Sequence, residues 1–202
     1  MSPSTSPSTS PSAVRLVFLG AAGVGKSSLI RRFLHDRFEH KYTRTVEELH
    51  VLEYGKMRLE ILDTSGSYSF PAMRELSIRH SDAFALVYAV DDAASLEEVR
   101  RLRDEILELR CGRSAHITVV GCKADLRDTE GRVLLAADVM STVEDEWDAD
   151  FVEASARTGG NAVGVFRSLL QQVKAPRRDS VCRPAVKKRR PPLKKNNSCV
   201  LS

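Results

Sequence analysis

The stretch Gly20-Ala-Ala-Gly-Val-Gly25-Lys26-Ser27 decides the fold of this chain. It follows an apolar, β-branched run, Val14–Gly20, that predicts a strand, and it opens a segment, Lys26–His35, with helical patterning. A glycine-rich turn between a strand and a helix lets backbone N–H groups surround an anion, and the helix N-terminus favours negative charge. The G-x-x-x-x-G-K-S spacing therefore predicts a phosphate loop; a chance lysine after a glycine-rich turn is the weaker interpretation.

The pattern on either side of this loop predicts an α/β fold. Further strands are predicted at Glu47–Tyr54, Met57–Asp63, Ala83–Val90, His116–Gly121 and Phe151–Ala154, and further helices at Ser95–Arg110, Leu134–Trp147 and Ala162–Val173. Tyr54-Gly55-Lys56 is typical of a hairpin turn. We therefore expect a six-stranded, mostly parallel sheet with one antiparallel hairpin and helices on both faces. Ligands bind such sheets at the carboxyl ends of the strands.

A second motif, Leu59-Glu-Ile-Leu-Asp63-Thr-Ser-Gly66, closes one of these strands. Asp63 is placed to hold Mg²⁺ through water, beside the Ser27 hydroxyl as a direct ligand, while Lys26 reaches the β- and γ-phosphates. Gly66 can offer its backbone N–H to the γ-phosphate. A strand that ends in Asp-Thr is usually structural, but its place after a phosphate loop favours the magnesium role.

A third motif, Cys122-Lys123-Ala-Asp125, follows the strand His116–Gly121. A carboxylate there can accept hydrogen bonds from the N1–H and the exocyclic amine of guanine, which adenine cannot match. With Glu153-Ala-Ser155-Ala156-Arg157 it indicates a guanine nucleotide. A surface Lys/Asp pair is the alternative interpretation, and the order of the motifs along the chain argues against it.

These motifs together resemble the Ras family of small GTPases, over about residues 14–174 and again at the last four residues. The resemblance implies a P-loop G domain that binds GTP or GDP with Mg²⁺. It places Thr45 as the second direct magnesium ligand and Phe38 against the base. The stretch 63–66 and the stretch 70–78 are most similar to the dexamethasone-induced Ras and Rhes branch, and the Ras-dva group is a second candidate. The implied nucleotide contacts are Gly20, Ala21, Ala22, Gly23, Val24, Gly25, Lys26, Ser27, Ser28, Phe38, Thr45, Asp63, Gly66, Cys122, Lys123, Asp125, Ser155 and Ala156.

The chain departs from the family where hydrolysis and exchange are controlled. The resemblance implies catalytic roles at Lys26, Thr45, Gly66 and residue 67, but Ser67 replaces the glutamine that orients the attacking water. Ala22 replaces a glycine and crowds the space that an activator's arginine needs, although several small GTPases also lack that glycine. Both changes predict slow hydrolysis.

Cys122 is the third departure, because it replaces an asparagine that ties the base loop to the phosphate loop. A thiol hydrogen-bonds weakly, and losing such a bond costs roughly 1–3 kcal/mol. Fast nucleotide exchange is therefore predicted.

These departures leave two functions open. The first is a membrane-anchored switch that hydrolyses GTP slowly, and the second is a GTP-loaded signalling adaptor with negligible turnover. A P-loop kinase would need a substrate lid that no segment is long enough to supply. The resemblance implies a monomer with effectors, an exchange factor and an activator as partners. The expected effector region is Tyr42, Thr43, Arg44, Thr45, Val46, Glu47 and Glu48, whose Thr43-Arg44, with His50 nearby, differs from Ras and argues against assuming Raf-type binding.

The two ends of the chain differ from its middle in composition. Residues 1–13 are a Ser/Thr/Pro repeat that we expect to be disordered, and no secretory signal is evident. From Lys174 onward the net charge is +9, against +4 for the whole chain, so the remainder carries −5. An acidic body with a basic tail argues against nucleic-acid binding.

The tail, residues 175–202, ends in Cys199-Val-Leu-Ser202, which fits C-a-a-X with a terminal serine and predicts farnesylation of Cys199 by farnesyltransferase. A single lipid anchors only marginally, and Lys187-Lys-Arg-Arg190 with Lys194-Lys195 supplies a second signal for anionic lipids. A nuclear localisation signal or a solvated charge run are the alternatives. We expect attachment to the cytoplasmic face of the plasma membrane; nothing raises palmitoylation of Cys182 above chance.

Overall fold

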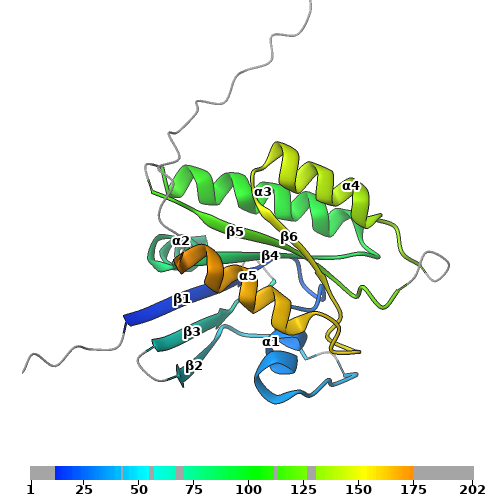
Figure 1. Ribbon diagram of the computed structural model, residues 1–202, viewed down its shortest axis with the longest axis horizontal. Helices are drawn as coiled ribbons and strands as arrows, with labels where there is room; N and C mark the ends of the chain where they lie inside the picture. The colour runs from blue at the N-terminus through cyan, green and yellow to red at the C-terminus, as the bar shows by residue number, and fades with distance from the viewer. Residues whose placement is uncertain are drawn as a thin grey trace, which may run out of the picture.

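The computed structural model describes residues 12–41, 43–54, 57–66, 71–111, 113–126 and 131–174. Six strands form one sheet in the order β2-β3-β1-β4-β5-β6. All neighbours pair in parallel except β2 and β3, which are antiparallel. The strands are β1 (Ser12–Leu19), β2 (Glu48–Tyr54), β3 (Met57–Asp63), β4 (Ala83–Ala89), β5 (His116–Cys122) and β6 (Asp150–Ala154). The predicted six-stranded, mostly parallel α/β fold is confirmed (Figure 1).

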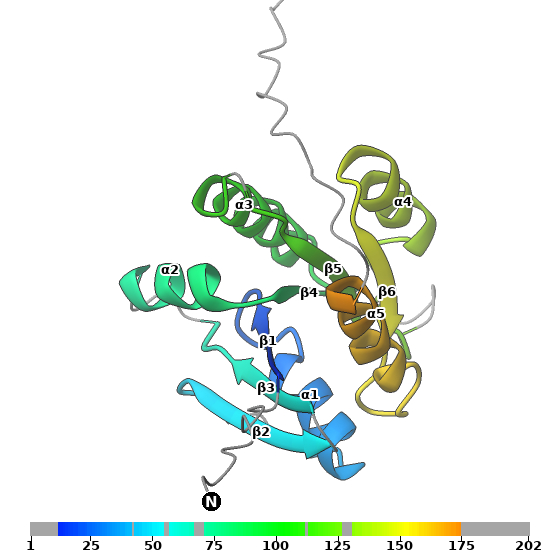
Figure 2. The ribbon, with the colours of Figure 1, turned by 60° about the vertical axis from the view of Figure 1, so that its left-hand side comes forward.

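Helices cover both faces of the sheet (Figures 1 and 2). They are α1 (Lys26–His35), α2 (Pro71–His80), α3 (Ala93–Leu109), α4 (Ala136–Ser141), the π-helical turn η1 (Thr142–Glu146) and α5 (Ala162–Lys174). One core joins α1 and α5 to the sheet, and a second joins α2, α3 and α4 to the opposite face. Because successive residues of a strand face opposite sides, Leu16 and Phe18 enter the first core while Val17 and Leu19 enter the second.

All seven residues of β4 are buried. Because helices cover both faces of this strand, its sequence is an unbroken apolar run. The same alternation fixes the register of β1 between β3 and β4, because a shift of one residue would exchange its two faces. This places the carboxyl ends of β1, β3, β4, β5 and β6 along one edge of the sheet, where the motif loops begin.

Strand β1 begins at Ser12, so Ser12 and Ala13 belong to the sheet, paired with Met57 and Arg58 of β3, and not to the segment 1–13 that was expected to be disordered. Two helices also differ from the sequence expectations. The helix expected at Leu134–Trp147 begins only at Ala136, because the backbone N–H groups of Val133 and Leu134 donate to the Val90 carbonyl in an extended approach. It then widens into the π turn η1, at whose end Trp147 N–H donates to the Thr142 carbonyl. Helix α2 was not among the predicted helices.

Several expectations lie outside the described residues. These are the N-terminal repeat as far as residue 11, the hairpin turn at 55–56, Tyr42, Ser67 and the whole tail from residue 175. Within the described ranges, no helix combines the length and apolar character that crossing a membrane requires.

Candidate nucleotide-binding site

The phosphate loop joins β1 to α1 and is shaped by its glycines. Gly20 has φ +145°, and a β-carbon there would lie 2.1 Å from the Val87 carbonyl oxygen, so only glycine fits against β4. Gly25, at φ +113°, stands at the N-cap position of α1. The loop thus turns back over the start of the helix, where unpaired backbone N–H groups favour an anion.

Lys26 is buried beneath this loop, with 5% of its surface exposed. Its Nζ donates hydrogen bonds to the carbonyl oxygens of Gly20 and Ala21, each at 2.8 Å. Burial lowers the pKa of Lys26 to about 8, while the nearby Asp63 carboxylate acts in the opposite direction. The ammonium is held where a phosphate chain lying in the loop would meet it.

Two hydroxyls and one carboxylate converge beside Lys26. The Ser27 Oγ and Thr45 Oγ1 atoms lie 2.6 Å apart, although the residues are 18 positions apart in the chain. Asp63, the last residue of β3, is 1% exposed, and its Oδ1 has no hydrogen-bond partner among the described residues. Burial raises the pKa of the Asp63 carboxyl group, while a hydrogen bond from Ser27 and the positive charge of Lys26 act to lower it.

This set of atoms fits a hard divalent cation. Mg²⁺ prefers oxygen ligands and keeps several waters, which suits two hydroxyls with a carboxylate behind them. The buried, unpartnered Asp63 oxygen would then face the water shell of the ion. Ser27, Thr45 and Asp63 are therefore the residues that would hold magnesium.

Gly66 lies against the phosphate loop from the other side. A β-carbon at this position would stand 2.3 Å from the backbone nitrogen and 2.4 Å from the Cα of Ala22. The start of the segment after β3 is thus in contact with the loop that would cradle the phosphates. This contact is available only to glycine.

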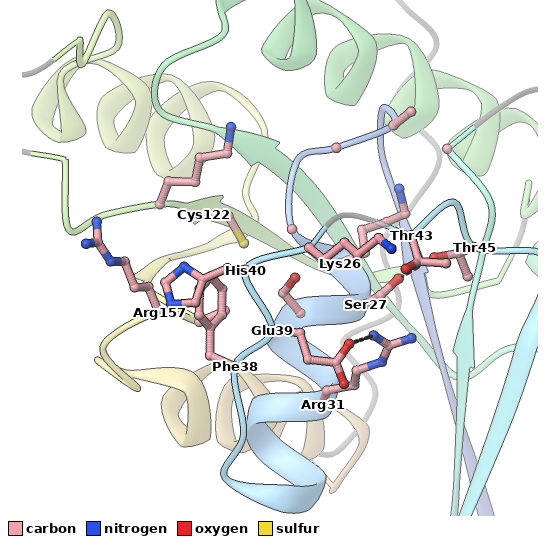
Figure 3. Close-up of a pocket in the computed structure, with 18 of the residues that line it drawn as sticks. Lys26, Ser27, Arg31, Phe38, Glu39, His40, Thr43, Thr45, Cys122 and Arg157 are labelled. Atoms are coloured by element: carbon pink, nitrogen blue, oxygen red, sulfur yellow. Dashed lines mark hydrogen bonds and ion pairs between the residues drawn. The ribbon is translucent and has the colours of Figure 1, made fainter.

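A cavity of about 570 Å³ extends from this phosphate end to a base end. Figure 3 shows Lys26, Ser27 and Thr45 at one end and Phe38, His40 and Arg157 at the other. The predicted site residues that line it are Ala22, Gly23, Gly25, Lys26, Ser27, Ser28, Phe38, Thr45, Gly66, Cys122, Lys123, Asp125 and Ala156. The other described residues of the predicted site, Gly20, Ala21, Val24, Asp63 and Ser155, are not among the residues that line the cavity.

These supporting residues have separate roles. Gly20 and Ala21 accept hydrogen bonds from Lys26, and Val24 is 1% exposed within the core that contains α1. Ser155 Oγ donates to Asp125 Oδ1 at 2.6 Å. Gly20, Ala21 and Ser155 thus also hold residues that line the cavity, and their predicted contacts with the nucleotide stay predictions.

At the base end one oxygen of the Asp125 carboxylate is held by a hydrogen bond and the other lies near a cation. Ser155 binds one, and the Arg157 guanidinium lies 3.7 Å from the other. Lys123, in the left-handed region at φ +65°, directs its Nζ to both oxygens of Asp91, at 3.0 and 2.9 Å. The Ser155 hydrogen bond orients the Asp125 carboxylate, which lines the cavity.

Cys122 ends β5 beside the phosphate loop. It is 1% exposed, and a β-carbon built on Gly25 would lie 3.4 Å from its Cβ and 3.5 Å from its Sγ. Burial raises the pKa of the thiol to about 12, so the group is neutral at physiological pH. A side chain at position 25 would therefore be in van der Waals contact with Cys122, and Cys122 shares a core with Val24 of the phosphate loop.

The segment before β2 closes the cavity. Phe38 is half-buried, and its ring meets that of His40 edge to face, with centroids 5.1 Å apart. Thr43 and Arg44 line the cavity with Thr45, whereas Val46 is 84% exposed and Glu47 and Glu48 are exposed. The expected effector region, apart from Tyr42, thus divides into a part that faces the cavity and a part that faces solvent.

Sequence reasoning missed some lining residues. Asp91 follows the carboxyl end of β4, which is the position that places ligand-facing residues in such sheets, and that signal could have identified it. Arg31, Arg37, Lys41 and Leu126 also line the cavity, and no sequence motif marks them.

The fold and the site together define a P-loop protein of the guanine-nucleotide-binding class. A model of the Ras family matches residues 15–175, and the chain belongs to that family. Mouse GTP-binding protein Rhes is 39% identical over 173 residues, which cover 80% of this chain and 65% of Rhes. Mouse GTP-binding protein Di-Ras2 is 37% identical over 161 residues, covering 77% of this chain and 79% of that protein. The Ras-related protein rapC of Dictyostelium discoideum is 36% identical over 166 residues, covering 79% of this chain and 59% of that protein.

Ras-family small GTPases bind GTP and GDP, typically with Mg²⁺, and hydrolyse GTP. The chain spans a little under two thirds of the length of the Rhes proteins that it matches.

Proposed function

We propose that this protein is a GTP- and GDP-binding switch whose segments around Thr45 and Gly66 close on the γ-phosphate. The observation that carries the proposal is the convergence of the Ser27 and Thr45 hydroxyls, 2.6 Å apart, beside the buried Lys26 ammonium. Thr45 belongs to a segment far from the phosphate loop in sequence. Its arrival at Ser27 supports a site that is completed when the triphosphate and its cation are bound.

The chain's own residues divide the work of binding. The phosphate-loop N–H groups and Lys26 bind the phosphates, and Asp125, whose carboxylate is oriented by Ser155, selects guanine. When bound, Mg²⁺ would neutralise part of the negative charge of the phosphates. Phe38 and the loop around Ala156 bound the base end of the cavity.

Hydrolysis is proposed to be slow. Ser67 follows Gly66 directly and is too short to orient water as glutamine does. Ala22, in contact with Gly66, carries a methyl group where an activator's arginine would need space. With weak anchoring at Cys122, exchange in a GTP-rich cytosol outpaces turnover, so the protein is mostly GTP-loaded.

A GTP-loaded adaptor with negligible turnover is the second candidate, favoured by the same two substitutions. Single-turnover hydrolysis by purified protein separates the two: a measurable rate that requires Mg²⁺ supports the switch, and no phosphate release over many hours supports the adaptor. A rate equal to that of an ordinary Ras protein would contradict slow hydrolysis in both.

The nucleotide itself is tested by purifying the protein and identifying what it carries. We expect guanine nucleotides, chiefly GTP, after denaturation and chromatography. The Lys26→Asn variant should retain much less, because the ammonium is lost. Equal retention by the variant, or free displacement of GTP by ATP, would remove the proposal.

The partners are proposed from the surface of the same segments. Glu47 and Glu48 are exposed, which suits effectors with basic surfaces, whereas Thr43, Arg44 and His50 set this surface apart from that of Ras. An exchange factor and an activator complete the expected set.

Membrane attachment is proposed from the tail. Farnesylation of Cys199 together with the basic run Lys187–Arg190 would hold the protein on the cytoplasmic face of the plasma membrane. Cell fractionation tests it: Cys199→Ser should move the protein from the membrane to the soluble fraction, and the control Cys182→Ser should not. An unchanged distribution of Cys199→Ser would contradict the proposal.

A further inference from the structure

Arg32, in the middle of α1, binds a segment that lies more than 120 positions away. Its Nε donates to the carbonyl oxygen of Ala156 at 2.8 Å, and its Nη2 donates to that of Arg157 at 2.7 Å. The remaining nitrogen, Nη1, donates to the Asp36 carboxylate at 2.9 Å and to the Asp36 carbonyl at 3.1 Å. All three nitrogens of the guanidinium are therefore engaged, and the side chain is only 16% exposed.

The segment that Arg32 holds forms the base end of the cavity. Ala156 lines the cavity, and the preceding Ser155 fixes Asp125 by a 2.6 Å hydrogen bond. The helix that carries Arg32 begins with Lys26 and Ser27, which belong to the phosphate end. One side chain thus links the element that holds the phosphates to the loop that orients the guanine acceptor.

The phosphate loop and the base end of the cavity are the two halves of the site. They also come together at Cys122, but this junction is weak in hydrogen bonding. Cys122 shares a core with Val24 of the phosphate loop, and its neutral thiol is a poor donor and acceptor. Hydrogen bonds from a charged group are stronger than neutral ones and are lost at a higher cost. The two halves are therefore joined by packing at Cys122 and by charge-assisted hydrogen bonds at Arg32.

We propose that Arg32 is a positioning residue that holds loop 155–157 in its nucleotide-binding geometry and slows nucleotide release, offsetting the loss of the asparagine at position 122. The inference rests on the proposed GTP-binding function. At this position arginine supplies two separate nitrogens of one planar, fully charged fork to the carbonyl oxygens of Ala156 and Arg157, whereas a lysine would have to serve both from a single nitrogen and a glutamine would be uncharged.

A purely structural role is the alternative, since Asp36 ends α1 in the left-handed conformation and its N–H donates to the Arg32 carbonyl. A helix-end contact would change the free energy of unfolding without coupling to position 122. The test therefore uses the rate of nucleotide release, and asks whether the effect of Arg32 depends on Cys122.

The experiment measures dissociation of a fluorescent GDP analogue from full-length protein in Mg²⁺ buffer. Arg32→Gln should accelerate release about tenfold or more, and Arg32→Lys should fall between it and the wild type. The control Arg101→Gln removes a helical arginine that pairs with Glu98 on α3, away from the cavity, and should leave release unchanged.

The decisive comparison is the same Arg32 substitution in a Cys122→Asn background. There the restored hydrogen bond should reduce the effect of Arg32→Gln to about twofold or threefold. Thermal unfolding of the nucleotide-free variants identifies any that fail to fold, and Arg32→Lys then serves in place of Arg32→Gln. Unchanged release from the Arg32 variants, or an equal effect in both backgrounds, would overturn the inference. A wild-type protein that retained no guanine nucleotide would instead remove the proposed function.

Discussion

The backbones of Gly66 and Ala22 are in contact, so closely that a β-carbon at residue 66 would lie 2.3 Å from the Ala22 nitrogen. Real β-carbons do not approach backbone atoms to this distance, so Gly66→Ala must push the two segments apart. Because this contact lies where a γ-phosphate would be enclosed, we expect a selective loss of affinity for GTP and its non-hydrolysable analogues, of about tenfold or more, with GDP binding retained. Competition binding of both nucleotides measures the ratio, and a ratio unchanged by Gly66→Ala would contradict this reading of the contact.

Nucleotide binding should depend on pH through Lys26. The nucleotide-free protein holds the Lys26 pKa at about 8, below the 10.5 of a free lysine. A triphosphate requires the ammonium form, so above pH 8 binding must take up a proton. Affinity should fall by up to about tenfold per pH unit between pH 8 and 10. Between these pH values the unfolded chain binds more protons than the nucleotide-free fold. The free energy of unfolding therefore rises with pH, because the cost of burying a charged Lys26 is progressively relieved.

Calorimetric titration at pH 8.5 in buffers of different ionisation enthalpy measures this proton uptake. The apparent binding enthalpy should vary with the buffer at pH 8.5 and much less at pH 6.5. A binding enthalpy that does not depend on the buffer at pH 8.5 would exclude the depressed pKa.

Cys122→Asn should slow nucleotide release. An asparagine amide can hydrogen-bond to the phosphate loop, beside which the thiol is only packed, and a bond of this kind is worth roughly 1–3 kcal/mol. Dissociation of a fluorescent GDP analogue should therefore slow by about 5- to 150-fold. Cys122→Ala, which adds no hydrogen bond, is the matched control and should not slow release. Slowing by both variants would point to packing as the cause.

Ser67→Gln should accelerate single-turnover GTP hydrolysis, because glutamine can reach and orient the attacking water. Ala22→Gly alone should have little effect on the intrinsic rate, but it should increase stimulation by any activator that inserts an arginine. Phosphate release after synchronised GTP loading measures both. A wild-type rate that already equals that of the glutamine variant would show that residue 67 does not limit hydrolysis.

The sequence predicted the phosphate loop itself because the spacing of its residues is local, whereas Thr45, 18 positions from Ser27, was implied only by the resemblance to the Ras family. Gly20 to Ser27 lie between a strand and a helix that could each be read from periodicity. Helix α2 was missed because its pattern is weak: Met73 and Leu76 are exposed, and Ile78 is its one buried residue.

The supports of the base end were not predictable in the same way. The Arg32 side chain donates to the backbone carbonyl oxygens of Ala156 and Arg157. Every residue has a backbone carbonyl, so the sequence does not indicate which ones a side chain will bind. The Lys123–Asp91 pair likewise depends on β4 and β5 being neighbours. Such contacts follow from topology, which the order of the motifs only implies.

Helix α5 runs against the direction of the parallel strands. Asn161, just before it, binds the Glu153 carbonyl near the end of β6, whereas Gln172, in its last turn, binds the Ile117 carbonyl at the start of β5. Lys174 therefore lies at the edge of the sheet opposite the cavity. A lipid attached beyond it, as proposed, would connect to the domain on the side away from the nucleotide opening, so regulators could approach that opening without displacing the anchor.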